Sequence, residues 1–193
     1  MESIIREALS ESIKTKERLI EEYADKIIGI SEKIAISIKN GNKLMLCGNG
    51  GSAADSQHIA AEFVNRFLIE RRPLPAIALT TDSSILTSIG NDYSFEDIFS
   101  KQVRALGKSG DILIGISTSG SSRNVINAIK VAKEMEIYTV AFSGGEGGEL
   151  SEVSDMSFNI RGKNTARIQE THIFLGHVIC ELVDNILFKG KER

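Results

Sequence analysis

The sequence predicts an α/β fold, in which a five-stranded parallel sheet is flanked by helices and preceded by an N-terminal helical extension. From about residue 42 onward, short apolar runs alternate with helical patterns, and each run is apolar at consecutive positions. Strands buried on both faces and separated by helices are typical of βαβ units in a parallel sheet. We expect one domain over residues 1–193, with N-terminal helices in 1–41 and a sheet-and-helix core in 42–193.

The first forty residues are expected to be helical. An apolar stripe follows spacings of four, three, four and four residues at Tyr23, Ile27, Ile30, Ile34 and Ile38. Such spacings place the side chains on one face of an amphipathic helix. The segment "NGN" at 40–42 predicts the helix end, with a glycine just beyond it.

The remaining elements are predicted from the pattern of apolar and polar residues. The predicted strands are 43–47, 76–79, 111–116, 138–142 and 156–160. The predicted helices are 53–69, 83–105 with an interruption around "GND", 122–135 and 166–188. The last of these is apolar around most of its circumference, which predicts burial in a core or between subunits.

Composition excludes several classes of protein. Lys and Arg number 23 against 26 Asp and Glu, a net charge of −3, which argues against nucleic acid as the main partner. We expect no membrane association, because we find no apolar run long enough to span a bilayer and no signal peptide. Cys47 and Cys180 form neither a metal-ligand spacing nor a disulfide framework, which favours a reduced, cytoplasmic location.

A glycine-rich loop, Gly48-Asn49-Gly50-Gly51-Ser52, follows the first predicted strand. Glycines allow a ligand to approach the backbone, and the first amides of the next helix are donors for an anion. The alternative is an ordinary turn with Ser52 as the helix N-cap. The loop also matches a dinucleotide-binding pattern, with Asp82 as the ribose-binding acid, but Asp82 lies too far along the chain. Neither this loop nor the next is followed by the G-K-[ST] of nucleotide hydrolases.

A second loop is rich in hydroxyl groups and follows the third predicted strand: Ser117-Thr118-Ser119-Gly120-Ser121-Ser122. Hydroxyls and helix-start amides together can surround a phosphate dianion, whereas the alternative is a solvated loop with a capping serine. Ligands of open parallel sheets bind beyond the carboxyl ends of the strands, where both loops are expected. The two loops predict a phosphorylated small molecule as the ligand.

Three further side chains could carry chemistry. His58 and Glu62 lie four residues apart on one helix face, where such a pair is more often structural than functional. The same spacing also suits a metal site or a general base. His177 lies in the apolar "IFLGHVICELV", where a core histidine is the ordinary interpretation. Gln169 precedes His177 by eight residues, or about 12 Å of helix, a wide gap for two ligands of one ion.

Two polar positions have ordinary alternatives. Arg66 could be a surface charge or an anion contact. Asn91-Asp92 in "SIGNDYSF" suits a turn that breaks a helix as well as it suits a binding site.

The chain resembles the bacterial phosphoheptose isomerases, a branch of the sugar isomerase (SIS) domain family. The resemblance covers nearly the whole chain, through "CGNGGSAAD", "HIAAEF", "PAIALTTD", "IGNDY", "GDILIGISTSGSSRNV" and "ARIQETHI". It implies a three-layer, doubly wound SIS domain. It also implies conversion of sedoheptulose 7-phosphate to D-glycero-D-manno-heptose 7-phosphate, the first step toward nucleotide-activated heptoses.

The resemblance also implies roles for individual residues. Glu62 and His177 match the catalytic pair, and His58, Glu62, Gln169 and His177 match the zinc site of some members. The residues that match substrate contacts are Asn49, Gly50, Gly51, Ser52, Glu62, Arg66, Asn91, Asp92, Ser117, Thr118, Ser119, Ser122 and Gln169. Members form homotetramers with sites between subunits. Our hypothesis for the reaction has Glu62 as the carbon base, His177 as the acid–base partner on oxygen, and one zinc ion per subunit.

Two other functions compete with this hypothesis. A relative with the same fold is a non-enzymatic tetrameric regulator that binds the replication initiator protein, and "KQVRALG" and "ARIQE" resemble it too. Glu62 and His177 favour the enzyme, because a scaffold needs neither a carboxylate beside the first loop nor an imidazole in an apolar helix. A sugar-phosphate sensor would bind the ligand without turnover.

Overall fold

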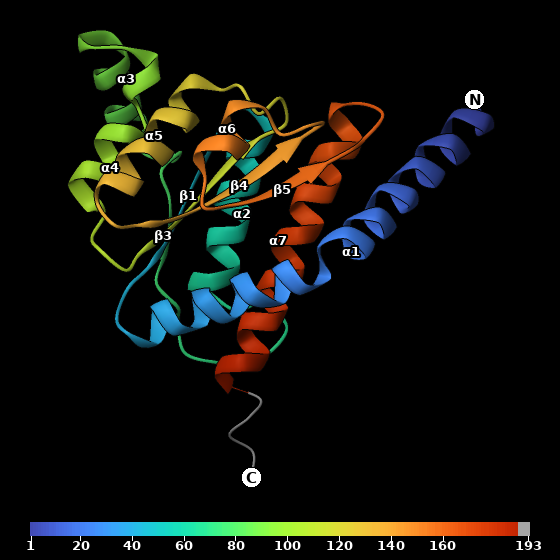
Figure 1. Ribbon diagram of the computed structural model, residues 1–193, viewed down its shortest axis with the longest axis horizontal. Coiled ribbons are helices and arrows are strands. Elements are labelled where there is room, and N and C mark those ends of the chain that lie inside the picture. Colours follow the sequence, from blue (N-terminus) through green and yellow to red (C-terminus); the bar gives the residue numbers. More distant parts are fainter. Residues whose placement is uncertain (189–193) are drawn as a thin grey trace.

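The computed structural model describes residues 1–188 and shows a parallel sheet between two layers of helices (Figure 1). Its strands are β1 (Leu44–Gly48), β2 (Ala76–Ala78), β3 (Ile112–Ser117), β4 (Tyr138–Gly144) and β5 (Met156–Ile160). Its helices are α1 (Glu2–Lys39), α2 (Gly51–Val64), α3 (Ser83–Asp92), the 3₁₀ turn η1 (Phe95–Asp97), α4 (Ser100–Leu106), α5 (Arg123–Glu134), α6 (Gly148–Val153) and α7 (Thr165–Phe188).

The sheet confirms the predicted fold class. Its five strands lie in the order β2-β1-β3-β4-β5, and every neighbouring pair is parallel. The central strands β1 and β3 are buried along their whole length, as their continuous apolar runs predicted. After β2 the chain returns to the other side of β1, so the strand order reverses between β1 and β3. This is the topological switch point, where open α/β sheets bind their ligands.

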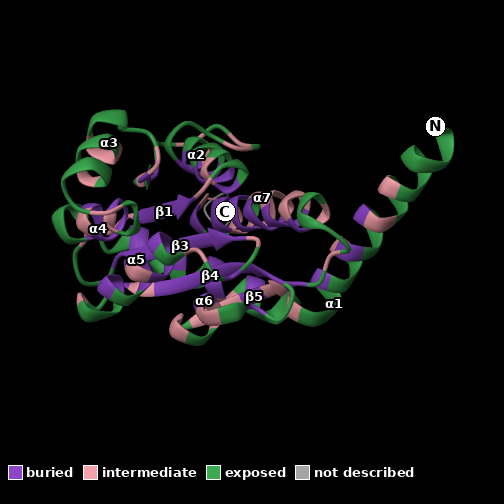
Figure 2. Cartoon of the chain, turned by 90° about the horizontal axis from the view of Figure 1, so that it is seen from above, coloured by how far each residue is buried: buried purple, intermediate pink, exposed green. Residues whose placement is uncertain are grey.

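Each face of the sheet has its own hydrophobic core. Leu44 and Leu46 of β1 belong to the core shared with α1, α2 and α7. Met45 and Cys47 belong to the core shared with α4, α5 and α6. Figure 2 shows the buried strands between these two layers of helices. Successive side chains of a strand point to opposite faces, so both faces must be apolar, which is why alternation is absent from the sequence.

Some predicted helix boundaries were wrong. The expected helix 53–69 ends at Val64. The expected interruption of helix 83–105 around "GND" is confirmed, because α3 ends at Asp92 and η1 separates it from α4. The N-terminal segment is one continuous helix rather than several. The short helix α6 was not predicted, because six residues are too few for a helical repeat of apolar positions to be visible.

The apolar stripe predicted over residues 23–38 of α1 is confirmed, and Tyr23 packs against the same core. Ile27, Ile30, Ile34 and Ile38 are buried, whereas Ile4, Leu9 and Ile13 near the N-terminus are exposed. Figure 1 shows this N-terminal part extending beyond the rest of the molecule. The expected helix end is confirmed, with Asn40 as the C-cap and Gly41 at φ +79°.

Helix α7 departs from the expectation that no segment could span a bilayer. By length and composition alone α7 is long and apolar enough to do so, but half of its most apolar window is buried inside the structure. A core helix of a globular domain has the same properties, and α7 packs against α1 and α2 in one core.

Candidate active site

The two predicted binding loops lie side by side at the switch point. Gly48 at the end of β1 pairs with Ile116 near the end of β3. The loop Gly48–Ser52, here called loop one, therefore begins beside Ser117–Ser122, here called loop two. Loop one leads into α2 and loop two leads into α5, so two helix N-termini open at the same edge of the sheet.

Neither of these helices has a side-chain cap. The N-cap of α2 is Gly50 at φ +53°, so the alternative of an ordinary turn capped by Ser52 was wrong. At α5 the N-cap is Ser122, but its hydroxyl makes no capping bond. By contrast, the side chain of Asp82 caps α3 by accepting from the Ile85 N–H at 2.9 Å, an ordinary structural role for the residue considered as a ribose-binding acid. Helix-start amides without a side-chain cap suit an anionic ligand.

Ser117 lies beside two other hydroxyl groups of loop two. Its Oγ lies 2.9 Å from the Oγ of Ser122 and 3.3 Å from that of Ser119. The Gly120 carbonyl of loop two accepts a hydrogen bond from the Leu150 N–H of α6 at 3.0 Å. The loop is therefore supported by the short helix that the sequence did not reveal.

A pair of amides joins loop one to the start of α5, the helix that follows loop two. Asn49 of loop one and Asn124 of α5 each donate to the other's side-chain oxygen at 2.9 Å. Asn124 is buried and was not among the predicted site residues. The only signal for Asn124 in the sequence was its position two residues after loop two, in "SSRN". Its pairing with Asn49 could not be predicted without knowing that β1 and β3 are neighbours.

Three candidate catalytic side chains converge between α2 and α7. The ligand atoms of His58, Glu62 and His177 all lie within 4.8 Å of one another. His58 Nε2 lies 2.9 Å from His177 Nε2 and 3.2 Å from Glu62 Oε1. Two imidazoles and a carboxylate are the donor set of many catalytic zinc sites, and the spacing of these atoms suits one small cation.

His177 is not the core histidine that its apolar neighbours suggested. Its ring is partly exposed and stacks on Phe67, with centroids 5.2 Å apart. Burial and the neighbouring His58 lower the pKa of His177, although Glu62 opposes them, so its neutral form is favoured. The fully buried histidine is His172, whose Nε2 lies 3.0 Å from the Ser143 carbonyl.

Gln169 does not join this group within the chain. Its side chain lies against Gly51, and its Nε2 is 3.5 Å from Asp55 Oδ1 at the start of α2. Gln169 and His177 therefore contact different turns of α2, as their eight-residue separation predicted. Whether Gln169 is a ligand of the same ion stays a prediction, and within one chain the geometry does not favour it.

The other predicted contacts lie on the surface. Arg66 is exposed and its Nε is 3.4 Å from Glu70. Asn91 donates to Asp92 at 2.9 Å at the end of α3, a helix with no fully buried residue. Within a single chain, Arg66, Asn91 and Asp92 do not belong to the His58–Glu62–His177 group.

The fold and the site define the class to which the chain belongs, the SIS domain proteins, whose family model matches residues 9–144. Sequence relatives identify the branch. The chain is 52% identical over 187 residues to a phosphoheptose isomerase of Nitratidesulfovibrio vulgaris, covering 97% of this chain and 90% of that protein. It is 54% identical over 189 residues to the one of Thermodesulfovibrio yellowstonii, covering 98% and 94%. The chain belongs to the phosphoheptose isomerase family.

A solved structure agrees with this assignment. A phosphoheptose isomerase of Neisseria gonorrhoeae superimposes with a TM-score of 0.89 at 43% identity, covering 95% of this chain and 98% of that one. The match extends over nearly the whole chain.

Proposed function

We propose that the chain converts D-sedoheptulose 7-phosphate to D-glycero-D-manno-heptose 7-phosphate through an enediol. The observation that carries this proposal is the convergence of His58 and Glu62, on the helix that loop one opens, with His177 of α7. The family of the chain supports the same substrate. A regulator or sensor has no need for this group of side chains.

The phosphate and the sugar are assigned to the two loops. The hydroxyls of loop two and the N-terminus of α5 suit the phosphate, because neutral donors and a helix dipole stabilise a dianion. The residues proposed to bind it are Ser117, Thr118, Ser119 and Ser122. The polar atoms of loop one, with Gln169, are proposed to bind the sugar hydroxyls: Asn49, Gly50, Gly51 and Ser52. Arg66, Asn91 and Asp92 are proposed as outer contacts.

The proton transfers are assigned to Glu62 and His177. Glu62 removes the proton from C1 of the ketose and returns a proton to C2 of the enediol. The neutral imidazole of His177 moves the proton between the two substrate oxygens, because a neutral ring can both accept and donate. The lowered pKa of His177 supports this role, since it keeps the ring neutral near pH 7.

His58, Glu62 and His177 would hold one zinc ion per subunit, with Gln169 of this or another subunit as a proposed fourth ligand. When bound, zinc would polarise the substrate carbonyl and stabilise negative charge on the adjacent oxygens. The fit rests on the two imidazoles and one carboxylate within 4.8 Å. Zinc bound tightly by Glu62 and His177 would occupy lone pairs that their proton transfers use, so the roles of both residues have to be tested directly.

We further propose a homotetramer in the cytoplasm. Exposed apolar side chains on α1 support assembly, because they gain by burial between subunits. Cys47 and Cys180 are both free and buried, which suits a reducing compartment.

The test is incubation of purified, metal-analysed protein with sedoheptulose 7-phosphate in deuterated water, followed by NMR. Formation of the aldoheptose 7-phosphate with deuterium at C2 is the expected result. Product without deuterium would still establish isomerase activity. It would mean that the transferred proton does not exchange with solvent, or that the reaction proceeds by a hydride shift. Saturable binding without product would favour the sensor or the regulator of the replication initiator.

A further inference from the structure

A buried arginine lies at the far end of the helix pair that carries the candidate active site. Arg71 belongs to the loop between α2 and β2, and its side chain is only 2% exposed. Its Nε donates to Asp184 Oδ1 on α7 at 2.9 Å, and the Asp184 side chain is 5% exposed. Ion pairs this deeply buried need further hydrogen bonds to compensate the loss of water.

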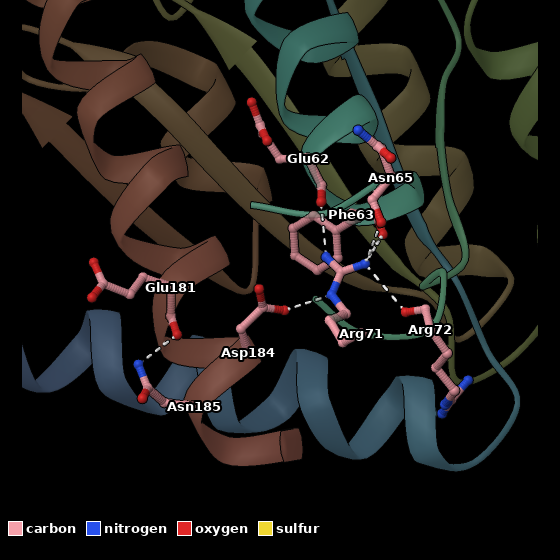
Figure 3. A network of polar contacts seen from close by, with 8 residues as sticks. All are labelled: Glu62, Phe63, Asn65, Arg71, Arg72, Glu181, Asp184 and Asn185. Atoms are coloured by element: carbon pink, nitrogen blue, oxygen red, sulfur yellow. Dashed lines mark hydrogen bonds and ion pairs between the residues drawn. The ribbon is translucent and has the colours of Figure 1, made fainter. Parts of the chain in front are cut away.

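Those further bonds go to the end of α2. The Nη2 of Arg71 donates to the Glu62 carbonyl at 2.8 Å, and its Nη1 donates to the Phe63 and Asn65 carbonyls at 2.8 and 3.0 Å. A third bond from Nη1 reaches the Arg72 carbonyl at 3.2 Å. Figure 3 shows the guanidinium between the end of α2 and Asp184, with the Glu62 carboxylate directed away from it. The last carbonyls of a helix lack internal partners, and a cation is favoured there.

The contact belongs to a series along α2 and α7. At the start of α2, Gln169 of α7 lies against Gly51. Next, His58 and Glu62 meet His177. Asp184 follows His177 by seven residues, two turns along the same face of α7, and reaches the end of α2 through Arg71. The catalytic group is thus bracketed by contacts between the same two helices.

We propose that Arg71 and Asp184 are positioning residues that hold Glu62 against His177. Arg71 is bonded to the backbone of Glu62 itself, and Asp184 lies on the helix of His177. The ion pair therefore fixes the relative position and rotation of α2 and α7 at the candidate active site. This role rests on the proposed function, because it assumes that Glu62 and His177 act together.

The test compares Arg71→Lys and Asp184→Asn with a control that breaks another buried ion pair. Lysine keeps the charge of Arg71 but cannot reach the carbonyls and Asp184 at once. The control is Asp111→Asn: the fully buried Asp111 pairs with Lys43 and accepts the Lys108 N–H at 2.9 Å, at the opposite, amino-terminal edge of the sheet. Circular dichroism and sedimentation establish which variants remain folded and assembled.

Three readouts separate positioning from stability. For Arg71→Lys and Asp184→Asn we expect kcat to fall about 10- to 100-fold with little change in KM. We expect the dissociation constant for Zn²⁺, measured by competition with a chromophoric chelator, to rise about 10- to 100-fold. Hydrogen exchange should become faster in a peptide covering residues 58–66. Asp111→Asn should lower thermal stability and leave all three unchanged.

The inference would be overturned if Arg71→Lys and Asp184→Asn matched Asp111→Asn in kcat, Zn²⁺ affinity and exchange. If Arg71→Lys fails to fold, Asp184→Asn decides, because its amide keeps the shape of the carboxylate. Zinc binding and exchange require no substrate, so they test the inference even if the wild-type chain proves not to be an isomerase. If the wild-type protein binds no zinc and has no isomerase activity, hydrogen exchange is the readout that tests the inference.

Discussion

At the scale of single residues, Glu62 occupies an environment that suits a base. Its side chain is 23% exposed and lies 3.2 Å from His58 Nε2, while its backbone carbonyl is held by Arg71. The carboxylate is therefore restrained in position but still accessible to a ligand. A restrained carboxylate is what abstraction of a proton from carbon requires.

Glu62→Gln should abolish most turnover without unfolding the protein. The amide keeps the size of the side chain but has no basicity, so we expect kcat to fall about 10²- to 10⁴-fold. Steady-state rates with sedoheptulose 7-phosphate measure the effect, and Glu134→Gln on the exposed surface is the control. Full turnover by the Glu62→Gln protein would remove Glu62 from the role of carbon base.

His172 should make stability depend on pH. Burial lowers its pKa from 6.5 to about 4. The unfolded chain therefore binds a proton below pH 6.5 that the folded chain does not, and stability falls as the pH falls from 6.5 toward 4. Between pH 7 and pH 5 we expect this residue to cost about 2 kcal/mol of unfolding free energy.

Urea unfolding at the two pH values, at fixed protein concentration, measures this loss. His172→Gln should lose less stability on acidification, because glutamine can donate to the Ser143 carbonyl but does not titrate in this range. An equal loss in both proteins would show that other groups account for the acid sensitivity.

At the scale of elements, loop two depends on its contact with the loop before α6. Gly120 has φ +67°, and a Cβ there would collide with the carbonyl group of Gly147. Gly145 has φ +61° but no atom within 4 Å of such a Cβ. A side chain at either position would strain the left-handed backbone. Only a side chain at Gly120 would also collide with Gly147.

Gly120→Ala should therefore be the more damaging of the two substitutions. Both should lose about 1 kcal/mol from the left-handed backbone conformation, and Gly120→Ala should lose roughly another 1 to 3 kcal/mol from overpacking. We also expect a higher KM for the sugar phosphate in Gly120→Ala alone, because loop two is displaced. Equal stability and equal KM in the two variants would contradict the proposed support of the phosphate loop.

At the scale of the whole molecule, the N-terminal part of α1 is the clearest candidate for a subunit contact. Leu9 is 61% exposed and Ile13 is 47% exposed, on a part of the helix that extends beyond the rest of the chain. Apolar side chains so placed favour association.

We expect the wild-type protein to sediment at four times the 21.1 kDa mass of the chain. The double substitution Leu9→Glu with Ile13→Glu should produce smaller species, because burying carboxylates between subunits is unfavourable. Leu106→Glu, at the exposed end of α4, is the matched control and should leave the mass unchanged. A wild-type protein that sediments as a monomer at micromolar concentration would refute the tetramer.

Much of the fold could be predicted because its signals are local. The five strands follow from continuous apolar runs, and α7 from a long apolar segment with helical spacing. Helix ends were predicted less well. At the end of α2, carbonyls that an isolated segment would leave to water accept hydrogen bonds from Arg71, seven residues beyond Val64, and no local pattern reveals that contact.

The sequence by itself determined the class of sheet, the two loops at its carboxyl edge and the residue types for isomerase chemistry. Adjacent residues and helical spacing carry that information. Only the tertiary structure decided that His177 meets His58 and Glu62, that Gln169 contacts an earlier turn of α2, and that Arg71 joins α2 to Asp184. These contacts join positions more than a hundred residues apart, and their geometry depends on how α2 and α7 pack against one face of the sheet.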